Sequence, residues 1–100
     1  MPKGYWVGHV TVDDPEAYGA YRRANAAAFA KYGGRFLVRG PEQEVVEGAL
    51  RQRTVVIEFP SLSAARDCYN SPEYQSAKAL RSGVSVADIA IVEGYDSIAE

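Results

Sequence analysis

One carboxylate, Glu58, stands inside the apolar run VVIEFPS, a pattern typical of a buried β-strand. A charge removed from water without a partner is costly, so Glu58 must face solvent, meet a partner or keep its proton. A partly buried carboxylate beside an apolar wall can also serve as a general base. His9, the single histidine, is the second candidate base. Arg39 is the candidate group for stabilising an enolate or a carboxylate.

Each of these candidates has a structural interpretation beside the catalytic one. Glu58 and Arg39 could form a ligand-binding or proton-transfer pair, or an ion pair across a dimer interface. We favour the ion pair, because structural ion-pair networks also perturb pKa values. For His9 we favour a histidine that is hydrogen-bonded to backbone or to Glu58 over a general base.

A second group of candidates lies at helical spacing. Tyr18, Tyr21 and Asn25 fall on one face of a predicted helix. The two tyrosine hydroxyls could orient an aromatic or enol substrate, although tyrosines at this spacing are more often core residues. Asn25 is a polar residue at a position that the periodicity buries, so it needs hydrogen-bond partners or a ligand. Tyr5 joins these three and Arg39 as a candidate ligand-binding residue.

Composition argues against several classes of function. The formal net charge is −2 and the basic residues are scattered, with Arg22 and Arg23 the only adjacent pair, so we expect no nucleic-acid or anionic-membrane partner. The single cysteine, Cys68, rules out an intrachain disulfide and a multi-thiolate metal site, and we expect it to be a packed thiol. No metal site and no cofactor are predicted. With no long apolar segment, we expect a cytoplasmic protein.

Turn and capping residues divide the chain into elements. Asp14 and Pro15 begin a helix that stops at Gly33. Ser61 caps a second helix, which Ser71 and Pro72 break and restart, and which ends near residues 82–83. The predicted strands are 4–12, 35–40, 53–59 and 87–95; residues 42–48 are expected to be extended before a turn, and 96–100 to be a frayed tail.

This order, β-α-β-β-α-β, predicts one α+β domain over residues 1–100. The expected architecture is a ferredoxin-like sandwich, in which two helices cover one face of a four-stranded antiparallel sheet. The other face would stay open. A homodimer formed through this open face is the simplest way to cover it.

Alternation along each strand assigns side chains to the two faces of the sheet. Val55 and Ile57 point to the helices, so Glu58 points to the open face. The same counting places Tyr5, His9 and Arg39 on the open face. Because the first and third strands are neighbours in the usual strand order, His9 and Glu58 are expected to lie close together.

The chain resembles the domain of unknown function 1330 family through five segments, GYWVGHVTVDDPEAY, KYGGRFLVRG, VVIEFPS, YNSPEYQ and IVEGYD. The resemblance implies a dimeric α+β barrel, in which two ferredoxin-like subunits pack sheet against sheet. The superfamily is similar in fold to small cofactor-free monooxygenases, muconolactone isomerase and stress-responsive barrel proteins. It supplies no catalytic residue. The positions that match its pattern are Tyr18, Tyr21, Arg39, Glu58, Tyr74 and Glu93.

Together these features favour a small homodimer that binds a small aromatic or carbonyl-bearing molecule in a cleft. If it is an enzyme, the sequence permits cofactor-independent proton abstraction or oxygenation, with Glu58 or His9 as the base. The alternative is a non-catalytic structural or interaction dimer with a polar interface.

Overall fold

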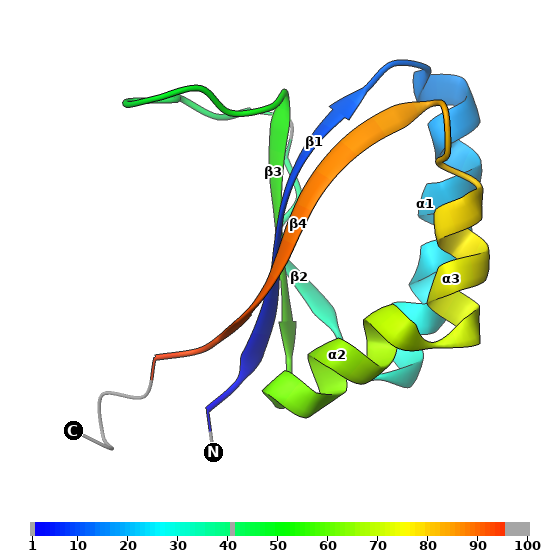
Figure 1. The fold of residues 1–100 in the computed structure, drawn as a ribbon, viewed down its shortest axis with the longest axis vertical. Helices are drawn as coiled ribbons and strands as arrows, with labels where there is room; N and C mark the ends of the chain where they lie inside the picture. The colour runs from blue at the N-terminus through cyan, green and yellow to red at the C-terminus, as the bar shows by residue number, and fades with distance from the viewer. Residues whose placement is uncertain (1, 41, 96–100) are drawn as a thin grey trace.

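Four antiparallel strands form one sheet, and the helices lie against one of its faces (Figure 1). The computed structural model describes residues 2–40 and 42–95, so the tail predicted at 96–100 lies outside the described residues. Within them the chain runs through β1 (Gly4–Val12), α1 (Pro15–Lys31), β2 (Arg35–Val38), β3 (Arg53–Phe59), α2 (Leu62–Asn70), α3 (Pro72–Ala79) and β4 (Ser85–Glu93).

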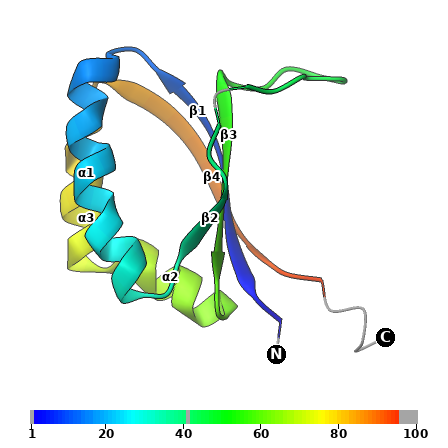
Figure 2. The same ribbon diagram turned by 180° about the vertical axis from the view of Figure 1, so that it is seen from behind.

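The strand order is β2-β3-β1-β4, with antiparallel pairing throughout. β1 and β3 are therefore neighbours at the centre of the sheet, as the ferredoxin-like prediction requires. The view from behind shows α1 and α3 side by side on the covered face, while the loop between β2 and β3 extends away from the sheet on the opposite side (Figure 2). The predicted α+β sandwich is confirmed.

The helix boundaries follow from local chemistry. Asp14 caps α1 by accepting a hydrogen bond from the backbone N–H of Ala17. After the C-terminal end of α1, Gly33 adopts a φ of +76°, a conformation that favours glycine. Ser71 ends α2 and caps α3, because its hydroxyl oxygen accepts from the Tyr74 N–H. Pro72 then occupies the first turn of α3. The split of the second helical segment is confirmed.

Two strands differ from their predicted limits. β4 spans Ser85–Glu93 instead of 87–95. Its pairing with β1 begins at Ser85, opposite Val12, and ends at Glu93, opposite Gly4, so the length of β1 fixes the length of β4. β2 ends at Val38 because a β-bulge interrupts its pairing with β3. The chain then leaves the sheet as a projecting loop up to residue 52, without a strand in its described part (Figure 1). Within it, Gly48 has a φ of +77°, in agreement with the predicted turn.

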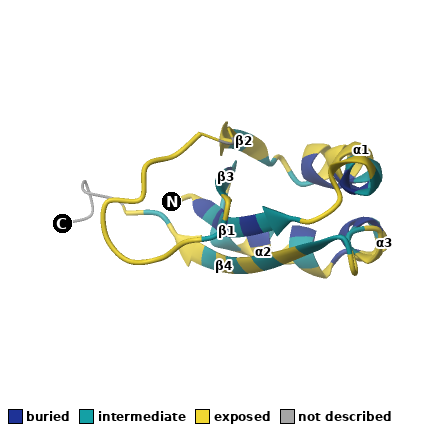
Figure 3. Ribbon diagram, turned by 90° about the horizontal axis from the view of Figure 1, so that it is seen from above, coloured by how far each residue is buried: buried dark blue, intermediate teal, exposed yellow. Residues whose placement is uncertain are grey.

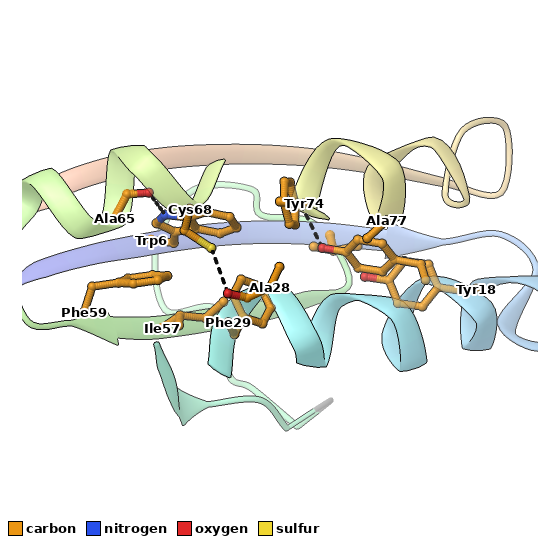
Figure 4. Close-up of a cluster of buried hydrophobic side chains, with 12 residues drawn as sticks. Trp6, Tyr18, Ala28, Phe29, Ile57, Phe59, Ala65, Cys68, Tyr74 and Ala77 are labelled. Atoms are coloured by element: carbon orange, nitrogen blue, oxygen red, sulfur yellow. Dashed lines mark hydrogen bonds between the residues drawn. The ribbon is translucent and has the colours of Figure 1, made fainter. Parts of the chain in front are cut away.

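The core is centred on Trp6 of β1. Its ring lies edge-to-face against Phe29, Tyr69 and Tyr74, at centroid distances of 5.2, 5.6 and 4.8 Å. The indole N–H also donates a buried hydrogen bond of 2.9 Å to the carbonyl oxygen of Ala65 in α2 (Figure 4). One side chain of the central strand thus contacts all three helices.

Burial along the strands follows the two faces of the sheet (Figure 3). Along β1 the residues from Gly4 to Val10 alternate between buried and half-buried. β4 is less covered, because its residues alternate between half-buried and exposed over most of its length. Among the helices of residues 2–40 and 42–95, none combines the length and the apolar character needed to cross a bilayer.

Gly4 supplies a test of how closely α2 approaches the sheet. A Cβ at Gly4 would collide with the backbone carbonyl of Ser61 and the Cα of Leu62, which cannot swing aside. We expect Gly4→Ala to lower the free energy of unfolding by about 1–3 kcal/mol, as overpacking does. The measurement is urea unfolding followed by circular dichroism at one fixed protein concentration.

Gly8 in the same strand is the matched control. A Cβ there would lie 3.5 Å from the nearest side-chain atom, an ordinary contact. Gly8→Ala should therefore be neutral or stabilise the protein by roughly 0.5–1 kcal/mol, since glycine weakens a strand. Equal effects of the two substitutions would contradict this account of α2 packing.

Candidate functional site

The predicted site residues divide between the two faces of the sheet. Tyr18, Tyr21, Asn25 and Arg39 line a cavity between α1 and the sheet. The other three, Tyr5, His9 and Glu58, lie in the open-face columns of β1 and β3. The seven residues therefore form two separate groups, and the candidate bases are not in the cavity.

The cavity has a volume of about 60 Å³ and a mainly apolar wall. Trp6, Gly8 and Val10 of β1 form part of this wall, with Val55 and Ile57 of β3 beside them. A protein cavity that admits benzene is about 150 Å³, so this cavity has less than half of that volume. Its size therefore suits a group of a few non-hydrogen atoms.

Asn25 is the most constrained polar residue of this cavity. The residue is only 4% exposed, and its Oδ1 atom has no hydrogen-bond partner. The helical spacing that placed Asn25 on the buried face of α1 is confirmed. A buried amide oxygen without a donor costs on the order of 1–3 kcal/mol, so a molecule that donates a hydrogen bond there would recover this free energy.

The tyrosines of α1 supply hydroxyl groups that stay protonated. The Tyr21 and Tyr74 hydroxyl oxygens lie 2.8 Å apart in the core, and Arg81 donates to the Tyr74 hydroxyl at 3.4 Å. Burial raises the pKa of Tyr21, and the neighbouring Tyr74 raises it further. Burial also raises the pKa of Tyr18. At neutral pH these side chains are hydrogen-bonding groups and not bases.

Arg39 lies on the opposite side of the sheet from its predicted position. Phe36 pairs with Ile57, and the bulge then brings Val38 opposite Val56, an open-face residue. The alternation is therefore shifted by one residue after Phe36. The Arg39 guanidinium lies over the Phe36 ring, 4.0 Å from its centroid, and lines the cavity.

Two further arginines at this cavity were not among the predicted site residues. Arg53 shares the alternation of Val55 and Ile57, so counting back along β3 places it on the helix side. Its Nε atom is buried and has no hydrogen-bond partner. Arg22 is exposed and also lines the cavity. The alternation was the signal that identifies Arg53, whereas nothing in the sequence distinguishes Arg22 from Arg23.

The cavity thus combines an apolar wall with cationic donors. Three arginines, two tyrosines and one asparagine line it, and no Asp, Glu or His is among its described lining residues. Such a site can hold an anionic or strongly polarised oxygen atom. It lacks a side chain suited to remove a proton at neutral pH.

On the open face, Glu58 accepts hydrogen bonds from Arg35 and from Tyr5. Its two carboxylate oxygens lie 3.0 Å from Arg35 Nε and 3.1 Å from the Tyr5 hydroxyl. Burial opposes ionisation of Glu58, but the hydrogen bonds from Arg35 and Tyr5 outweigh it and hold the pKa of the carboxyl below its usual value. The predicted pairing of Glu58 with Arg39 is therefore wrong. Arg35 pairs with Glu58 because the two residues face each other across β2 and β3.

His9 does not lie beside Glu58. The strand register places it opposite Thr54 on β3 and Asp88 on β4, and its Nδ1 lies 3.1 Å from Thr54 Oγ1. Thr54 precedes Glu58 by four residues on the same strand, a separation of roughly 13 Å. The prediction that β1 and β3 are neighbours is confirmed. The predicted contact between His9 and Glu58 is wrong, because the register places Tyr5, and not His9, opposite Glu58.

Cys68 is a packed thiol, as expected. It is fully buried in α2, and its Sγ lies 3.7 Å from the carbonyl oxygen of Ala28 (Figure 4). Burial raises the pKa of this thiol to about 12, so it is protonated at neutral pH. A group of three or more His, Cys, Asp or Glu side chains placed to hold a metal ion does not occur among residues 2–40 and 42–95.

Solved structures with the same fold cover nearly the whole chain. A protein of unknown function from Rhodopseudomonas palustris has a TM-score of 0.76 at 18% identity, and the alignment covers 95% of this chain and 84% of that one. SnoaB, a cofactor-independent oxygenase from Streptomyces nogalater, has a TM-score of 0.64 at 16% identity with both chains covered completely. At such identities the likeness shows the fold alone.

A third structure is that of a dimeric protein of unknown function and ferredoxin-like fold from Bacteroides fragilis. It has a TM-score of 0.60 at 13% identity and covers 91% of this chain and 95% of its own. No curated protein sequence matches this chain. A family model does match it, over residues 3–95, and this model is the Domain of unknown function (DUF1330). With the ferredoxin-like fold in place and nearly every residue covered by that model, the chain belongs to the DUF1330 family.

Proposed function

We propose that this protein binds a small aromatic or carbonyl-bearing molecule in the cavity between α1 and the sheet. The observation that carries the proposal is the buried Asn25 side chain, whose Oδ1 has no partner in a cavity with an apolar wall. A ligand that carries a hydrogen-bond donor, such as the hydroxyl group of an enol or of a hydroxylated carbonyl compound, would satisfy this atom and fill the space. The volume of about 60 Å³ favours a small carbonyl compound, because an aromatic ring would require the walls to separate.

The chemistry that this cavity supports is stabilisation of an oxyanion. Arg39 and Arg53 carry the positive charge, and neither needs to move a proton for this role. Glu58 and His9 lie on the open face, so we assign them no role as bases in the cavity. SnoaB, which shares this fold, is described as a cofactor-independent oxygenase, so chemistry without a cofactor occurs on the fold. We therefore propose binding, with turnover only of a ligand that ionises without a protein base.

We further propose a homodimer formed through the open sheet face. This face carries large apolar side chains that are substantially exposed, and they include Leu37, Val38 and Val92. The fold likeness to a protein from Bacteroides fragilis described as dimeric supports the proposal. In such a dimer the ion pair of Glu58 and Arg35, with the Tyr5 hydroxyl, would supply the polar part of the interface.

Filling the cavity tests ligand binding. Val55→Phe places a ring in the cavity from the centre of the sheet, and we expect it to abolish binding by occupying the space. The measurement is ¹H–¹⁵N NMR of the wild-type protein and the variant with hydroxyacetone, 4-hydroxybenzaldehyde, pyruvate and benzoate, the first two of which carry a hydrogen-bond donor. At least one of these should shift the wild-type amides of Gly8, Asn25 and Val55.

Val46→Phe is the control, because Val46 is 83% exposed in the projecting loop and away from the cavity. It should bind as the wild-type protein does. The binding proposal fails if none of the four compounds shifts the cavity amides, or if Val55→Phe leaves the shifts intact.

A charge on the open face tests the dimer. Val92 lies opposite Tyr5 on the open face, so Val92→Lys would bury an ammonium group in the interface. We expect the dimer dissociation constant to rise at least tenfold, measured by sedimentation velocity. Leu80→Lys is the control, because Leu80 is 48% exposed at the end of α3 on the helix side. A monomeric wild-type protein at 0.1 mM, roughly the range of weak dimers, would refute this assembly.

Acid titration tests the environment of Glu58. Its folded pKa is lowered, so its contribution to stability is present above its unfolded pKa of about 4.3 and is lost as the pH falls through the folded pKa. Between pH 6 and pH 3 the wild-type free energy of unfolding should therefore fall more steeply than that of Glu58→Gln. Glu93→Gln, at the exposed end of β4, is the matched control for the loss of one carboxylate. Parallel wild-type and Glu58→Gln curves would contradict the hydrogen-bonded carboxylate.

A further inference from the structure

Some arginines of this protein form an ion pair with a carboxylate of the same chain, and others do not. Arg35 and Arg51 form ion pairs with Glu58 and Asp88, at 3.0 and 2.7 Å. The three arginines of the cavity, Arg22, Arg39 and Arg53, form none with the described residues. They come from α1, from the loop after β2 and from β3, and all three line one mainly apolar cavity. Their charges are therefore unneutralised by protein groups where α1 meets the sheet.

Arg22 and Arg39 are exposed, so water can solvate them, but Arg53 is only half-exposed. Its Nε–H is a buried donor without an acceptor. Leaving a charged group's donor buried and unpaired costs more than leaving a neutral one, and a carboxylate is the acceptor that guanidinium groups match best. Arg53 therefore indicates that the missing partner is an anion.

Asn25 adds a second requirement at the same cavity. Its unpartnered atom is an acceptor, Oδ1, which needs a donor and would repel a bare carboxylate. A ligand that satisfies both residues must carry an acceptor for Arg53 and a donor for Asn25. A carboxylate with a nearby hydroxyl group meets both requirements. The cavity volume of about 60 Å³ limits such a ligand to a short chain.

We propose that the cavity binds a short-chain hydroxy acid. Its carboxylate accepts a hydrogen bond from Arg53 Nε, and its hydroxyl donates to Asn25 Oδ1. Arg22 and Arg39 at the cavity mouth attract the anion and stay partly hydrated. This assignment rests on the proposed function and specifies the ligand class of the same cavity.

Glycolate and two matched analogues provide the test. Acetate lacks the hydroxyl group, and glycolamide lacks the charge. We expect the cavity amides to titrate in ¹H–¹⁵N NMR at constant ionic strength, with a dissociation constant for glycolate at least tenfold below that for glycolamide and at least threefold below that for acetate.

Two variants assign these preferences to residues. Arg53→Met keeps the aliphatic stem and should abolish the preference for glycolate over glycolamide. Asn25→Leu should abolish the preference for glycolate over acetate, and its NMR spectrum reports whether the fold is retained. Arg66→Met, at an exposed position of α2 that does not line the cavity, is the control for loss of one positive charge and should keep both preferences.

The outcomes distinguish failure of the hydroxy-acid assignment from failure of ligand binding at the cavity as a whole. Equal binding of glycolate and glycolamide, or equal losses in Arg53→Met and Arg66→Met, would overturn the hydroxy-acid assignment while leaving the cavity a binding site. Binding of a carbonyl compound from the earlier set without any binding of glycolate would do the same. If neither set shifts the cavity amides, the proposed function and this inference both fail.

Discussion

The helix-facing side of β1 determines how closely α2 packs against the sheet and where the cavity lies, because glycine alternates with larger side chains along it. Gly4 lets the first turn of α2 approach the strand, and Trp6 then fills the space between the layers with an indole that contacts aromatic rings from all three helices. Gly8 follows with no side chain, so the packing that Trp6 provides stops there. The cavity is the space that this missing side chain leaves beneath α1.

The two faces of the sheet differ in whether their polar side chains have partners within the chain. On the open face Glu58 meets Arg35, and Asp88 meets Arg51, so charges there are matched within the subunit. On the helix face Arg53 and Asn25 keep buried polar atoms without partners. Matched charges are suited to a stable surface or an interface, whereas unmatched buried groups are costly unless a bound molecule satisfies them. This contrast places the candidate binding site between α1 and the sheet.

Membership of the DUF1330 family and the shared fold do not by themselves define an activity. The solved structures of this fold include a cofactor-independent oxygenase and proteins of unknown function, and these share less than 20% sequence identity with this chain. In this chain the described cavity lining offers guanidinium, hydroxyl and amide groups but no carboxylate or imidazole. The side chains at the cavity therefore carry more information about function than the architecture does.

Short-range chemistry made much of the fold predictable. Asp14, Ser61 and Ser71 cap helices through bonds to residues three positions away, and alternation assigned β1 and β3 to the correct faces. Tyr18, Tyr21 and Asn25 were recognised as one buried helical face for the same reason. Each of these features depends on neighbours within about one turn or one strand.

Only the tertiary structure decided how the candidate groups combine. The bulge after Phe36 moved Arg39 to the helix side, and the register of β1 with β3 paired Glu58 with Tyr5 instead of bringing it to His9. A bulge and a register depend on the pairing of strands that are distant in the sequence, so no local pattern specifies them. The sequence alone determined which side chains could act, and the long-range pairing of the strands determined which of them share a site.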